Sequence, residues 1–519
     1  EATAAATLSA SVNYPLRGAV TFKATVGTNV ASDALANLSS GGVTGGALII
    51  IGEDYGEGSS IMQERSHAFA MKSQVWLLDP RPNLPSIVAA VEKGFELSEA
   101  SNTPVMLELR IRACHVTGRF TAKDNLRPRF TLKDAMEHPQ RDTNRVALPP
   151  ATYLHEKEKI EKRWPAAVRF IQEQRLNEFF SADAEDIGIV LQGGLYNSVL
   201  RSLELLGVAD VFGESRVPLY VLNVTYPLID AEFVRFCQGK KAILIVEEGQ
   251  PDFIEQAVNT ILRRADVQTR VEGKNCLPMA GEYTGAVLRD GLRKFINAHR
   301  PDLLPEPARS PAAPDARLQT ALSLINPQMH ARPPSFCTGC PERPLFSAMK
   351  LVERDLGAHH VSCDIGCHLF SILPPFNIGN TTMGYGLGAA GAAAFAAPSG
   401  KRAIAVMGDG GFWHNGLASG VGNAVFNKSD NVLVIVDNGY SAATGGQDLP
   451  SSKAEVQTRA TNNPIERAVR GVGVEWVRTI DDTYDVARMR DTLTEALTTP
   501  AKGPKVIVAQ SECMLNKQR

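Results

Sequence analysis

A glycine-rich turn in the C-terminal part of the sequence carries groups that suit a metal-bound diphosphate. An apolar run, Ala403–Met407, leads into this turn, and a second apolar run, Val432–Val436, leads into Asp437 and Asn438. Both runs are typical of strands in a parallel sheet, whose carboxyl ends share one edge, so we expect Asp409 and Asn438 to meet although 28 residues separate them. Such oxygen ligands suit Mg²⁺, and glycines would let backbone amides approach a pyrophosphate where a helix begins. The turn consists of Gly408, Asp409, Gly410 and Gly411.

This pattern predicts a magnesium-bridged diphosphate site. The alternative is an ordinary strand-to-helix turn in which Asp409 only caps the helix expected over Leu417–Phe426.

Five of the eight cysteines lie in the same part of the chain: Cys337, Cys340, Cys363, Cys367 and Cys513. A Cys-x-x-Cys turn presents two thiolates to one metal centre, and two further cysteines could complete a four-thiolate [4Fe-4S] site. Zinc accepts the same ligands. Unrelated buried thiols are a third interpretation, because spacing alone does not show whether Cys513 folds back toward the others.

The elements that must position these groups form three α/β stretches, in which short β-branched runs alternate with helical patterns. In the first stretch we expect strands over Gly18–Thr25, Ala47–Gly52 and Thr103–Ile111 and a helix over Leu84–Leu97. In the second we expect strands over Ile187–Gln192, Pro218–Val224 and Ala242–Glu247, with a tight turn at Gly193-Gly194 before a helix over Tyr196–Leu206. That glycine turn alone is only a weak signal for nucleotide binding.

The predicted boundaries are residues 1–135, a helical connector at 136–185, a second domain at 186–300, a linker at 301–330 and a third domain at 331–519. The connector has a charged core, Glu156–Arg163, which is typical of a solvated helix. The stretch Arg300–Pro314 is too rich in proline for a helix or a central strand and indicates a semi-rigid linker.

Composition excludes several classes of function. The 519 residues carry a formal net charge of -2, which offers no footprint for nucleic acid or for an anionic membrane. The longest apolar runs are of strand length, short of the roughly 20 residues that cross a bilayer. The chain starts at Glu1 without a signal-like segment, and its eight cysteines do not make a disulfide framework, so we expect a protein of the reducing cytoplasm.

The glycine turn and the strand after it resemble the thiamine-diphosphate signature, in which Gly-Asp-Gly is followed some two dozen residues later by Asn-Asn. Here 26 residues separate Gly410 from Asp437, which replaces the first Asn. The resemblance implies that Mg²⁺ is bound by Asp409, Asn438 and the main-chain carbonyl of Tyr440.

Nearly the whole chain resembles the 2-oxoacid:ferredoxin oxidoreductase family, of the indolepyruvate type. The stretches that carry this resemblance are Lys23–Asp33, Cys337–Arg343, Cys363–Cys367, Gly408–Gly416 and Ala443–Gln447. It implies a multidomain α/β fold with pyrimidine-binding and pyrophosphate-binding domains at the two ends and a transketolase-C-like domain between them. It also implies a [4Fe-4S] cluster on Cys337, Cys340, Cys367 and Cys513, with Cys363 as a spare.

The activity implied is the coenzyme-A-dependent oxidative decarboxylation of an aryl 2-oxo acid to an aryl-acetyl-CoA, CO₂ and reduced ferredoxin. The implied partner is a smaller gamma-domain-like (beta) subunit, in a hetero-oligomer with two copies of each subunit, and coenzyme A is a co-substrate. A non-oxidative thiamine-diphosphate-dependent decarboxylase, which needs no cluster, is the alternative enzyme. A non-catalytic scaffold is a third interpretation, but none of the motif residues that such a protein would lose is lost here.

The sequence departs from the family at three places. It lacks the Tyr-Pro-Gly-Thr-Pro-like turn near the start and the cysteine-rich tail, so we expect the N-terminal domain to be incomplete. Glu342 stands where a histidine is common.

Three further roles are predicted. By the resemblance, Glu1 matches the glutamate that contacts N1′ of the aminopyrimidine, although a terminal residue is ordinarily a solvated end. His414 could steer the substrate carboxylate or move a proton, unless it is simply structural. Thr444 and Gln447 could touch diphosphate or substrate, although turn-forming bonds would explain them equally.

Overall fold

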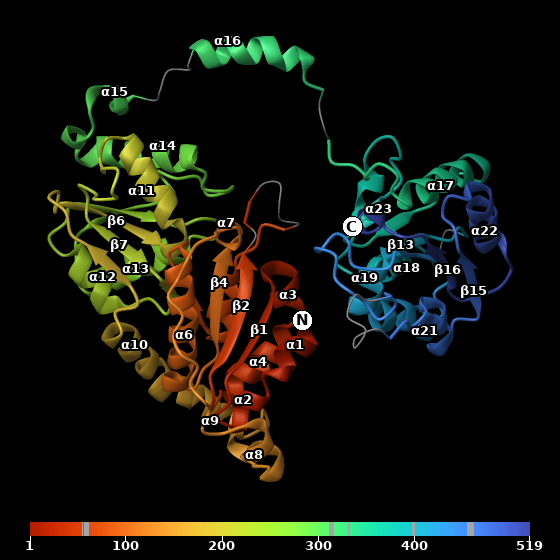
Figure 1. Cartoon of the computed structure of the whole chain (residues 1–519), viewed down its shortest axis with the longest axis horizontal. Helices are drawn as coiled ribbons and strands as arrows, with labels where there is room; N and C mark the ends of the chain where they lie inside the picture. The colour runs from red at the N-terminus through yellow and green to blue at the C-terminus, as the bar shows by residue number, and fades with distance from the viewer. Residues whose placement is uncertain are drawn as a thin grey trace. The chain divides into compact units, whose positions relative to one another are not determined.

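The computed structural model describes residues 1–53, 55–56, 62–310, 316–330, 333–396, 400–453 and 461–518. The chain divides into two compact units, Glu1–Leu322 and Ser323–Arg519. The first unit contains two β-sheets and the second contains one (Figure 1). No helix among the described residues is long and apolar enough to cross a membrane.

The first sheet has the strand order β1-β2-β4-β3-β8, in which β1 to β4 pair in parallel and β8 pairs antiparallel with β3. Its strands are β1 (Gly18–Lys23), β2 (Ala47–Glu53), β3 (Trp76–Leu78), β4 (Val105–Arg110) and β8 (Val224–Tyr226). Strand β8 belongs to the sequence stretch assigned to the second domain, so the first sheet takes its edge strand from that stretch. The first strand is shorter than predicted, because helix α3 begins at Ala24.

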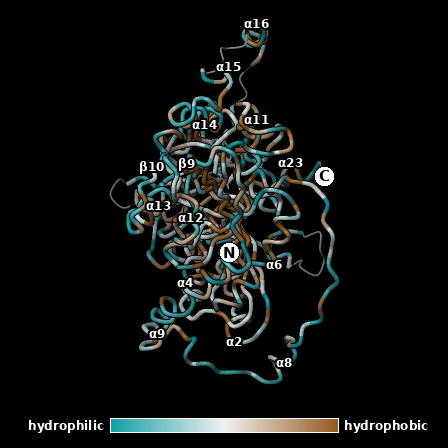
Figure 2. The backbone as a smooth tube through the Cα atoms, turned by 90° about the vertical axis from the view of Figure 1, so that its left-hand side faces the viewer, coloured by the Kyte–Doolittle hydropathy of each residue, from teal (hydrophilic) through white to brown (hydrophobic). Residues whose placement is uncertain are grey.

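Helices cover the first sheet on both faces, and their apolar residues form two separate clusters against it. The helices are α1 (Ala2–Thr7), α2 (Ala10–Asn13), α3 (Ala24–Val30), α4 (Ser32–Gly41), α5 (Ser66–Ser73), α6 (Leu84–Ser101) and α7 (Ile111–Cys114). The stretch on either side of α8 (Leu132–Glu137) is largely hydrophilic (Figure 2).

The charged core of the connector is largely exposed, as its sequence predicts. It continues through η1 (Thr143–Arg145), α9 (Ala151–Glu158), a segment of π geometry (Lys159–Arg163) and α10 (Trp164–Glu173). Arg163 is buried and donates hydrogen bonds to the carbonyls of Ser39, Ser40 and Gly41 at the end of α4. Five of the eight residues of Glu156–Arg163 are exposed, as a solvated helix predicts, and Arg163 is the exception, because its guanidinium satisfies helix-terminal carbonyls that would otherwise lack donors.

The second sheet has the order β10-β9-β6-β7-β5, parallel except for β5. Strands β6, β7 and β9 are fully buried, which explains their continuous apolar runs. Its strands are β5 (Glu178–Phe180), β6 (Ile187–Gln192), β7 (Leu219–Leu222), β9 (Ala242–Val246) and β10 (Arg270–Glu272). Its helices are η3 (Gly193–Leu195), α11 (Tyr196–Leu205), α12 (Asp230–Cys237), α13 (Phe253–Arg264) and α14 (Gly285–His299).

The proline-rich segment is not extended throughout. It forms the short turns η4 (Pro301–Leu303) and α15 (Glu306–Arg309), and Leu303 and Leu304 pack into the core of the second sheet. The linker prediction is thus wrong for its first residues, while residues 311–315 lie outside the described part of the chain. Helix α16 (Ala316–Ile325) and η5 (Asn326–Gln328) follow.

The third sheet is entirely parallel, in the order β12-β11-β13-β14-β16-β15. Helices pack on both faces over two apolar clusters. The strands are β11 (Val361–Cys363), β12 (Thr381–Thr382), β13 (Ile404–Gly408), β14 (Val432–Asp437), β15 (Trp476–Ile480) and β16 (Lys505–Gln510). The helices are α17 (Glu342–Leu356), η6 (Cys367–Ile372), α18 (Gly388–Ala396), α19 (Asp409–Gly411), η7 (Phe412–Gly422, of π geometry), α20 (Asn423–Phe426), α21 (Ile465–Gly471), α22 (Val486–Thr498) and α23 (Met514–Gln518).

Candidate cofactor and cluster sites

The carboxyl ends of β13 and β14 bring Asp409 and Asn438 together. The two strands pair in parallel with Gly408 opposite Val436, so both residues lie just beyond the same edge. One carboxylate oxygen of Asp409, Oδ2, accepts hydrogen bonds from the backbone N–H of Asn438 at 3.0 Å and of Gly439 at 2.8 Å. The other, Oδ1, accepts from the N–H of Gly410 at 2.8 Å. The aspartate therefore ties the two strand ends into one structure.

The electrostatics of this edge favour a cation. Asp409 is 1% exposed, and its burial raises the pKa of its carboxyl to about 8, with a further contribution from the Asp437 carboxylate. The amide Oδ1 of Asn438 is buried and has no hydrogen-bond partner among the described residues. A divalent cation would neutralise the first group and satisfy the second, so these side chains fit Mg²⁺. Asp437 faces elsewhere, because its Oδ2 accepts from Gln510 Nε2 at 2.9 Å.

Packing dictates two of the glycines in the turn. A Cβ atom at Gly410 would lie 2.3 Å from the Tyr385 hydroxyl, and one at Gly411 would lie 2.0 Å from Asp364 Oδ2. At Gly408 the nearest atom would be 3.7 Å away, in the His368 ring. We expected these glycines because they let the backbone approach a diphosphate. At two of them there is a second reason, since side chains of the protein already fill the space that a Cβ atom would need.

A chain of hydroxyl groups covers the turn. The Tyr385 hydroxyl lies 2.9 Å from Ser441 Oγ, which lies 2.7 Å from Thr444 Oγ1, and Thr444 in turn donates to Gln447 Oε1. The ring of His414 lies beside that of Tyr385, with centroids 4.8 Å apart. Thr444 and Gln447 do make the turn-forming bonds that were the alternative explanation for them. Tyr440, the residue before Ser441, is buried.

Tyr385 and Ser441 are the residues that sequence reasoning missed. The pair of glycines around Tyr385, Gly384 and Gly386, is the sequence feature that points to a special turn there. Their φ values are 80° and 78°, a backbone conformation that other residues rarely adopt.

The four cysteines of the expected cluster lie near one another at the same sheet edge. Cys337 and Cys340 form a tight turn, in which the Cys340 N–H donates to the Cys337 carbonyl at 3.1 Å. Cys367 begins η6 after β11. Cys513 follows β16, and its N–H donates to the carbonyl of Asn438 at 3.1 Å. The side chain of the next residue, Met514, packs against Gly339 inside the Cys337–Cys340 turn, so the end of the chain does fold back.

The thiols also influence one another electrostatically. Burial, together with the nearby Glu342 and the other three cysteines, raises the pKa of Cys367 to about 12. Burial likewise raises the pKa of Cys340 to about 12, with Glu342, Cys337 and Cys513 adding to the effect. Within the described ranges, no three His, Cys, Asp or Glu side chains stand close enough to hold a single metal ion. Four thiols in one neighbourhood fit a cluster in which each thiolate binds a different iron atom.

Glu342 is a buried carboxyl group close to Cys340 and Cys367. It is 2% exposed at the start of α17, and its Oε2 is 3.9 Å from Nδ1 of the buried His368. Burial raises the pKa of Glu342 to about 7. The glutamate therefore faces the protein interior.

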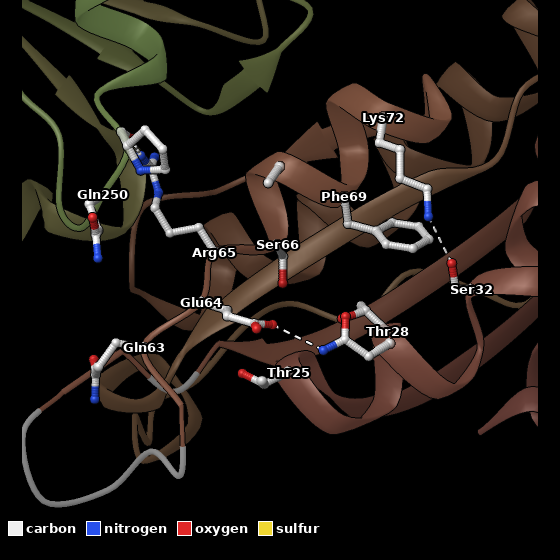
Figure 3. A pocket seen from close by; sticks show the side chains of 13 residues that line it. Thr25, Thr28, Ser32, Gln63, Glu64, Arg65, Ser66, Phe69, Lys72 and Gln250 are labelled. Carbon is white, nitrogen blue, oxygen red and sulfur yellow. Dashed lines mark hydrogen bonds between the residues drawn. The ribbon is translucent and has the colours of Figure 1, made fainter. Parts of the chain in front are cut away.

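The first unit holds a separate pocket of about 480 Å³, on the side of the first sheet where β1 ends and α5 begins (Figure 3). Polar side chains line it and bond to one another. Asn29 donates to Glu64 Oε2 at 3.0 Å, and Lys72 donates to Ser32 Oγ at 2.9 Å. Glu1 is not among the lining residues and lies at the start of α1.

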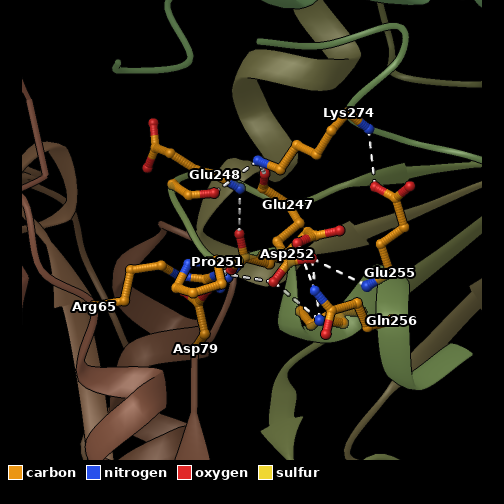
Figure 4. Close-up of polar contacts among 12 residues, drawn as sticks. Arg65, Asp79, Glu247, Glu248, Pro251, Asp252, Glu255, Gln256 and Lys274 are labelled. Atoms are coloured by element: carbon orange, nitrogen blue, oxygen red, sulfur yellow. Dashed lines mark hydrogen bonds and ion pairs between the residues drawn. The ribbon is translucent and has the colours of Figure 1, made fainter. Parts of the chain in front are cut away.

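Next to this pocket, buried ion pairs join the two sheets of the first unit (Figure 4). Arg65 donates to Glu247 Oε1 at 2.7 Å and Arg110 pairs with Glu248, both across the two sheets, while Arg110 also pairs with Asp79, on the side of the first sheet, at 2.8 Å. The N–H of Gly194 donates to Asp79 Oδ1 at 3.0 Å. The Gly193-Gly194 turn is therefore the tight strand-to-helix turn that was expected, and it packs on the first sheet.

Comparison with known proteins identifies a matching domain family and several relatives of this chain. Residues 364–509 match the family described as thiamine pyrophosphate enzyme, C-terminal TPP binding domain. A protein of Methanothermobacter thermautotrophicus named Indolepyruvate oxidoreductase subunit IorA is 29% identical over 507 residues, which cover 96% of this chain and 76% of that protein. The protein of the same name from Thermococcus kodakarensis is 26% identical over 514 residues, covering 95% and 74%. Six relatives bear this name.

Over nearly its whole length the chain is similar to proteins named Indolepyruvate oxidoreductase subunit IorA. Among solved structures, a 2-oxoglutarate:ferredoxin oxidoreductase from Magnetococcus marinus is 20% identical with a TM-score of 0.30, covering 36% of this chain and 66% of that one. The predicted fold class, a multidomain α/β protein of the thiamine-diphosphate type, is confirmed by the family match and by the parallel sheets. The motifs Cys363–Cys367 and Gly408–Gly416 lie at the carboxyl edge of the third sheet.

Proposed function

We propose that this chain is the thiamine-dependent subunit of a 2-oxoacid:ferredoxin oxidoreductase of the indolepyruvate type. An aryl 2-oxo acid and coenzyme A would give an aryl-acetyl-CoA and CO₂, while two electrons leave one at a time through a [4Fe-4S] cluster to ferredoxin. The observation that carries the proposal is the 3.1 Å hydrogen bond from Cys513 N–H to the Asn438 carbonyl. It joins a residue suited to the cluster directly to one suited to the cation.

The second unit supplies the residues for the cation and the diphosphate. Asp409, Asn438 and the carbonyl of Tyr440 would hold Mg²⁺. The backbone of Gly408, Gly410 and Gly411 and the hydroxyl of Thr444 would face the diphosphate, since they border the same edge. Thiamine diphosphate, when bound there, would supply a carbon nucleophile and the electron sink that holds the bonding pair left behind by CO₂.

Two side chains would manage protons. The ring of His414 lies beside the ring of Tyr385, so we propose that His414 moves a proton at this edge or orients the substrate carboxylate. Glu1 would hold a proton at N1′ of the aminopyrimidine. Replacement of Glu1 by Gln is expected to abolish turnover while cofactor binding persists, and unchanged turnover would remove Glu1 from the mechanism.

The thiolates of Cys337, Cys340, Cys367 and Cys513 would hold the cluster. None of the eight cysteines forms a disulfide bond in the described part of the chain, as a reducing compartment would ensure, and we propose a cytoplasmic enzyme. Zinc at the same thiolates would accept no electron, so the oxidative reaction requires iron.

The remaining parts of the chain have proposed roles by the resemblance. Residues 1–135 would bind the aminopyrimidine, and they supply most of the lining of the pocket in Figure 3, to which Gln250 and Pro251 also contribute. Residues 186–300 form the transketolase-C-like domain, and 331–519 bind the diphosphate and the cluster. A smaller beta subunit would complete a hetero-oligomer with two copies of each chain, which sedimentation of the purified complex can test.

The activity can be tested on the complex purified without oxygen. We expect coenzyme-A-dependent viologen reduction with indolepyruvate and other aryl 2-oxo acids, and its loss in Asp409→Asn. A brown protein with absorbance near 400 nm is also expected, because iron–sulfur clusters absorb there. Carbon dioxide release without coenzyme A, from a colourless protein, would instead identify a non-oxidative decarboxylase.

A further inference from the structure

A long segment between α7 and α8 lies almost wholly on the surface of the first unit. Residues 115–131, which we call the arm, form neither a helix nor a strand, and every residue from 117 to 129 is exposed. Loops longer than about 12–15 residues without secondary structure are uncommon in compact domains, and they usually have a function or are disordered. Ordering such a segment costs conformational entropy that exposed residues do not offset, so the arm needs contacts from another surface.

The arm is basic. It has a net charge of +3, from one acidic residue, Asp124, and four basic residues, Arg119, Lys123, Arg127 and Arg129. In the described part of the chain, Lys123 pairs with Glu92 and the three arginines form no ion pair. The arm therefore presents a positive surface to any chain that approaches it.

Exposed apolar side chains accompany these charges. Leu126, in the second half of the arm, is 93% exposed. Leu132 and Met136 lie one turn apart on the same face of α8 and are 66% and 79% exposed. A single exposed apolar residue is ordinary, but three within eleven positions, next to several arginines, are typical of a surface that another protein covers.

The loop between α11 and β7 offers a complementary surface. Residues 209–215, which we call the tip, contain Asp210 and Glu214 and no basic residue, so their net charge is -2. Asp210 Oδ1 accepts hydrogen bonds from the N–H groups of Phe212 and Glu214, both at 2.9 Å, which closes the loop into a turn. Val211 and Phe212 are 76% and 88% exposed on that turn. The tip is thus acidic and apolar, whereas the arm is basic and apolar.

The arm and the tip belong to different parts of the first unit. The arm runs beside α6, since Lys123 pairs with Glu92 on that helix. The tip packs against α11, where a Cβ atom at Gly213 would lie 3.2 Å from Leu200. Two copies of the chain related by a twofold axis can satisfy both surfaces at once, because the arm of each copy meets the tip of the other.

We propose that the arm of one copy of this chain docks on the tip of a second copy, with Arg127 and Arg129 facing the acidic residues of the tip and Leu126 against Phe212. The inference rests on the proposed function, which includes an assembly with two copies of each subunit, and it names the surfaces that join those copies. Electrostatic complementarity of this kind selects the partner and speeds association, and salt weakens it.

The test is sedimentation equilibrium of the complex of this chain with its partner subunit, at low and at physiological salt. Arg127→Glu with Arg129→Glu changes the net charge of the arm to -1, and Asp210→Asn with Glu214→Lys changes that of the tip to +1. The asparagine keeps an oxygen that can close the turn. Each pair of substitutions should raise the dissociation constant between the two halves of the complex by about tenfold or more, because like charges then face each other. All four together restore opposite charges, so the constant should return to within about threefold of its original value.

The matched control is Arg263→Glu with Arg264→Glu. These neighbouring arginines are exposed in the last turn of α13, in the same unit, and form no ion pair within the described ranges. They carry the same change of charge on a surface outside the arm and the tip, so the dissociation constant should equal that of the unmodified complex. All the substituted side chains are exposed, so none of the changes removes a buried contact.

Arm or tip variants that keep the mass of the unmodified complex would overturn the proposal, as would the four substitutions together if they fail to restore that mass. Unchanged mass with arm-dependent binding to vesicles that contain phosphatidylserine would overturn it in favour of a membrane surface. If the unmodified complex holds one copy of each chain, the proposed assembly fails together with this inference, whereas coenzyme-A-dependent viologen reduction by that complex tests the proposed activity separately.

Discussion

Asn438 offers a test in which stability and cofactor binding respond differently to one substitution. Its amide oxygen is buried without a hydrogen-bond partner among the described residues. An unsatisfied buried polar group costs about 1–3 kcal/mol. Asn438→Ala removes that cost together with a little packing, so the free energy of unfolding without cofactor should be unchanged or up to about 2 kcal/mol higher.

The same substitution should abolish the stabilisation that the cofactor provides. Magnesium and thiamine diphosphate at 100 times the dissociation constant should stabilise the unmodified protein by about 2.7 kcal/mol. In a unit the size of Ser323–Arg519, each kcal/mol raises the melting temperature by about 2–4 °C, so the expected rise is about 5–11 °C. The variant should show almost none of it at the same concentrations, because a ligand of the cation is gone. Thermal melts with and without the cofactor measure both effects.

Asn431 provides the matched control at the other end of β14. Both polar atoms of its amide are buried without partners in the described part of the chain. Asn431→Ala should therefore stabilise the protein to a similar extent and keep the whole cofactor-induced rise. If Asn438→Ala kept that rise as well, the assignment of Asn438 as a cation ligand would be refuted.

Three further substitutions test other parts of the account. Gly411→Ala should destabilise the protein by about 1–3 kcal/mol, because its Cβ would lie 2.0 Å from a buried carboxylate oxygen. Gly408→Ala should be tolerated, because no atom lies closer than 3.7 Å to its Cβ position. Equal denaturation midpoints for the two variants would contradict this packing. Cys513→Ser should sharply lower the iron content of the anaerobically purified protein and Cys276→Ser should not, and iron that stays in the first variant would remove Cys513 from the ligand set. Arg110→Met should cost about 3–5 kcal/mol in urea unfolding, since it leaves buried carboxylates unpaired, and an unchanged midpoint would show that the ion pairs contribute nothing.

Parts of the cofactor site could be predicted because they depend on local patterns. Short apolar runs that end in Gly-Asp-Gly and in Asp-Asn are enough to place Asp409 and Asn438 at one sheet edge, provided that the strands are parallel neighbours. The structure shows β13 beside β14, so this condition is met.

Other parts depend on strand order and on packing, which spacing does not encode. The return of Cys513 requires β16 to lie beside β14, which places the end of the chain next to Asn438. The position of Tyr385 over Gly410 depends on a turn that no regular pattern marks. In the sequence, Arg163 cannot be distinguished from the other charged residues of a polar helix, and only its tertiary contacts show that it is buried.

The most direct test of the central claim is an electron paramagnetic resonance spectrum of the anaerobically purified complex, frozen after addition of indolepyruvate and coenzyme A. If an iron–sulfur cluster lies beside the thiamine site, a reduced-cluster signal should appear only when thiamine diphosphate and the 2-oxo acid are both present, and it should be absent in Asp409→Asn. A spectrum without any cluster signal, in protein that nevertheless releases CO₂ from indolepyruvate, would contradict the claim.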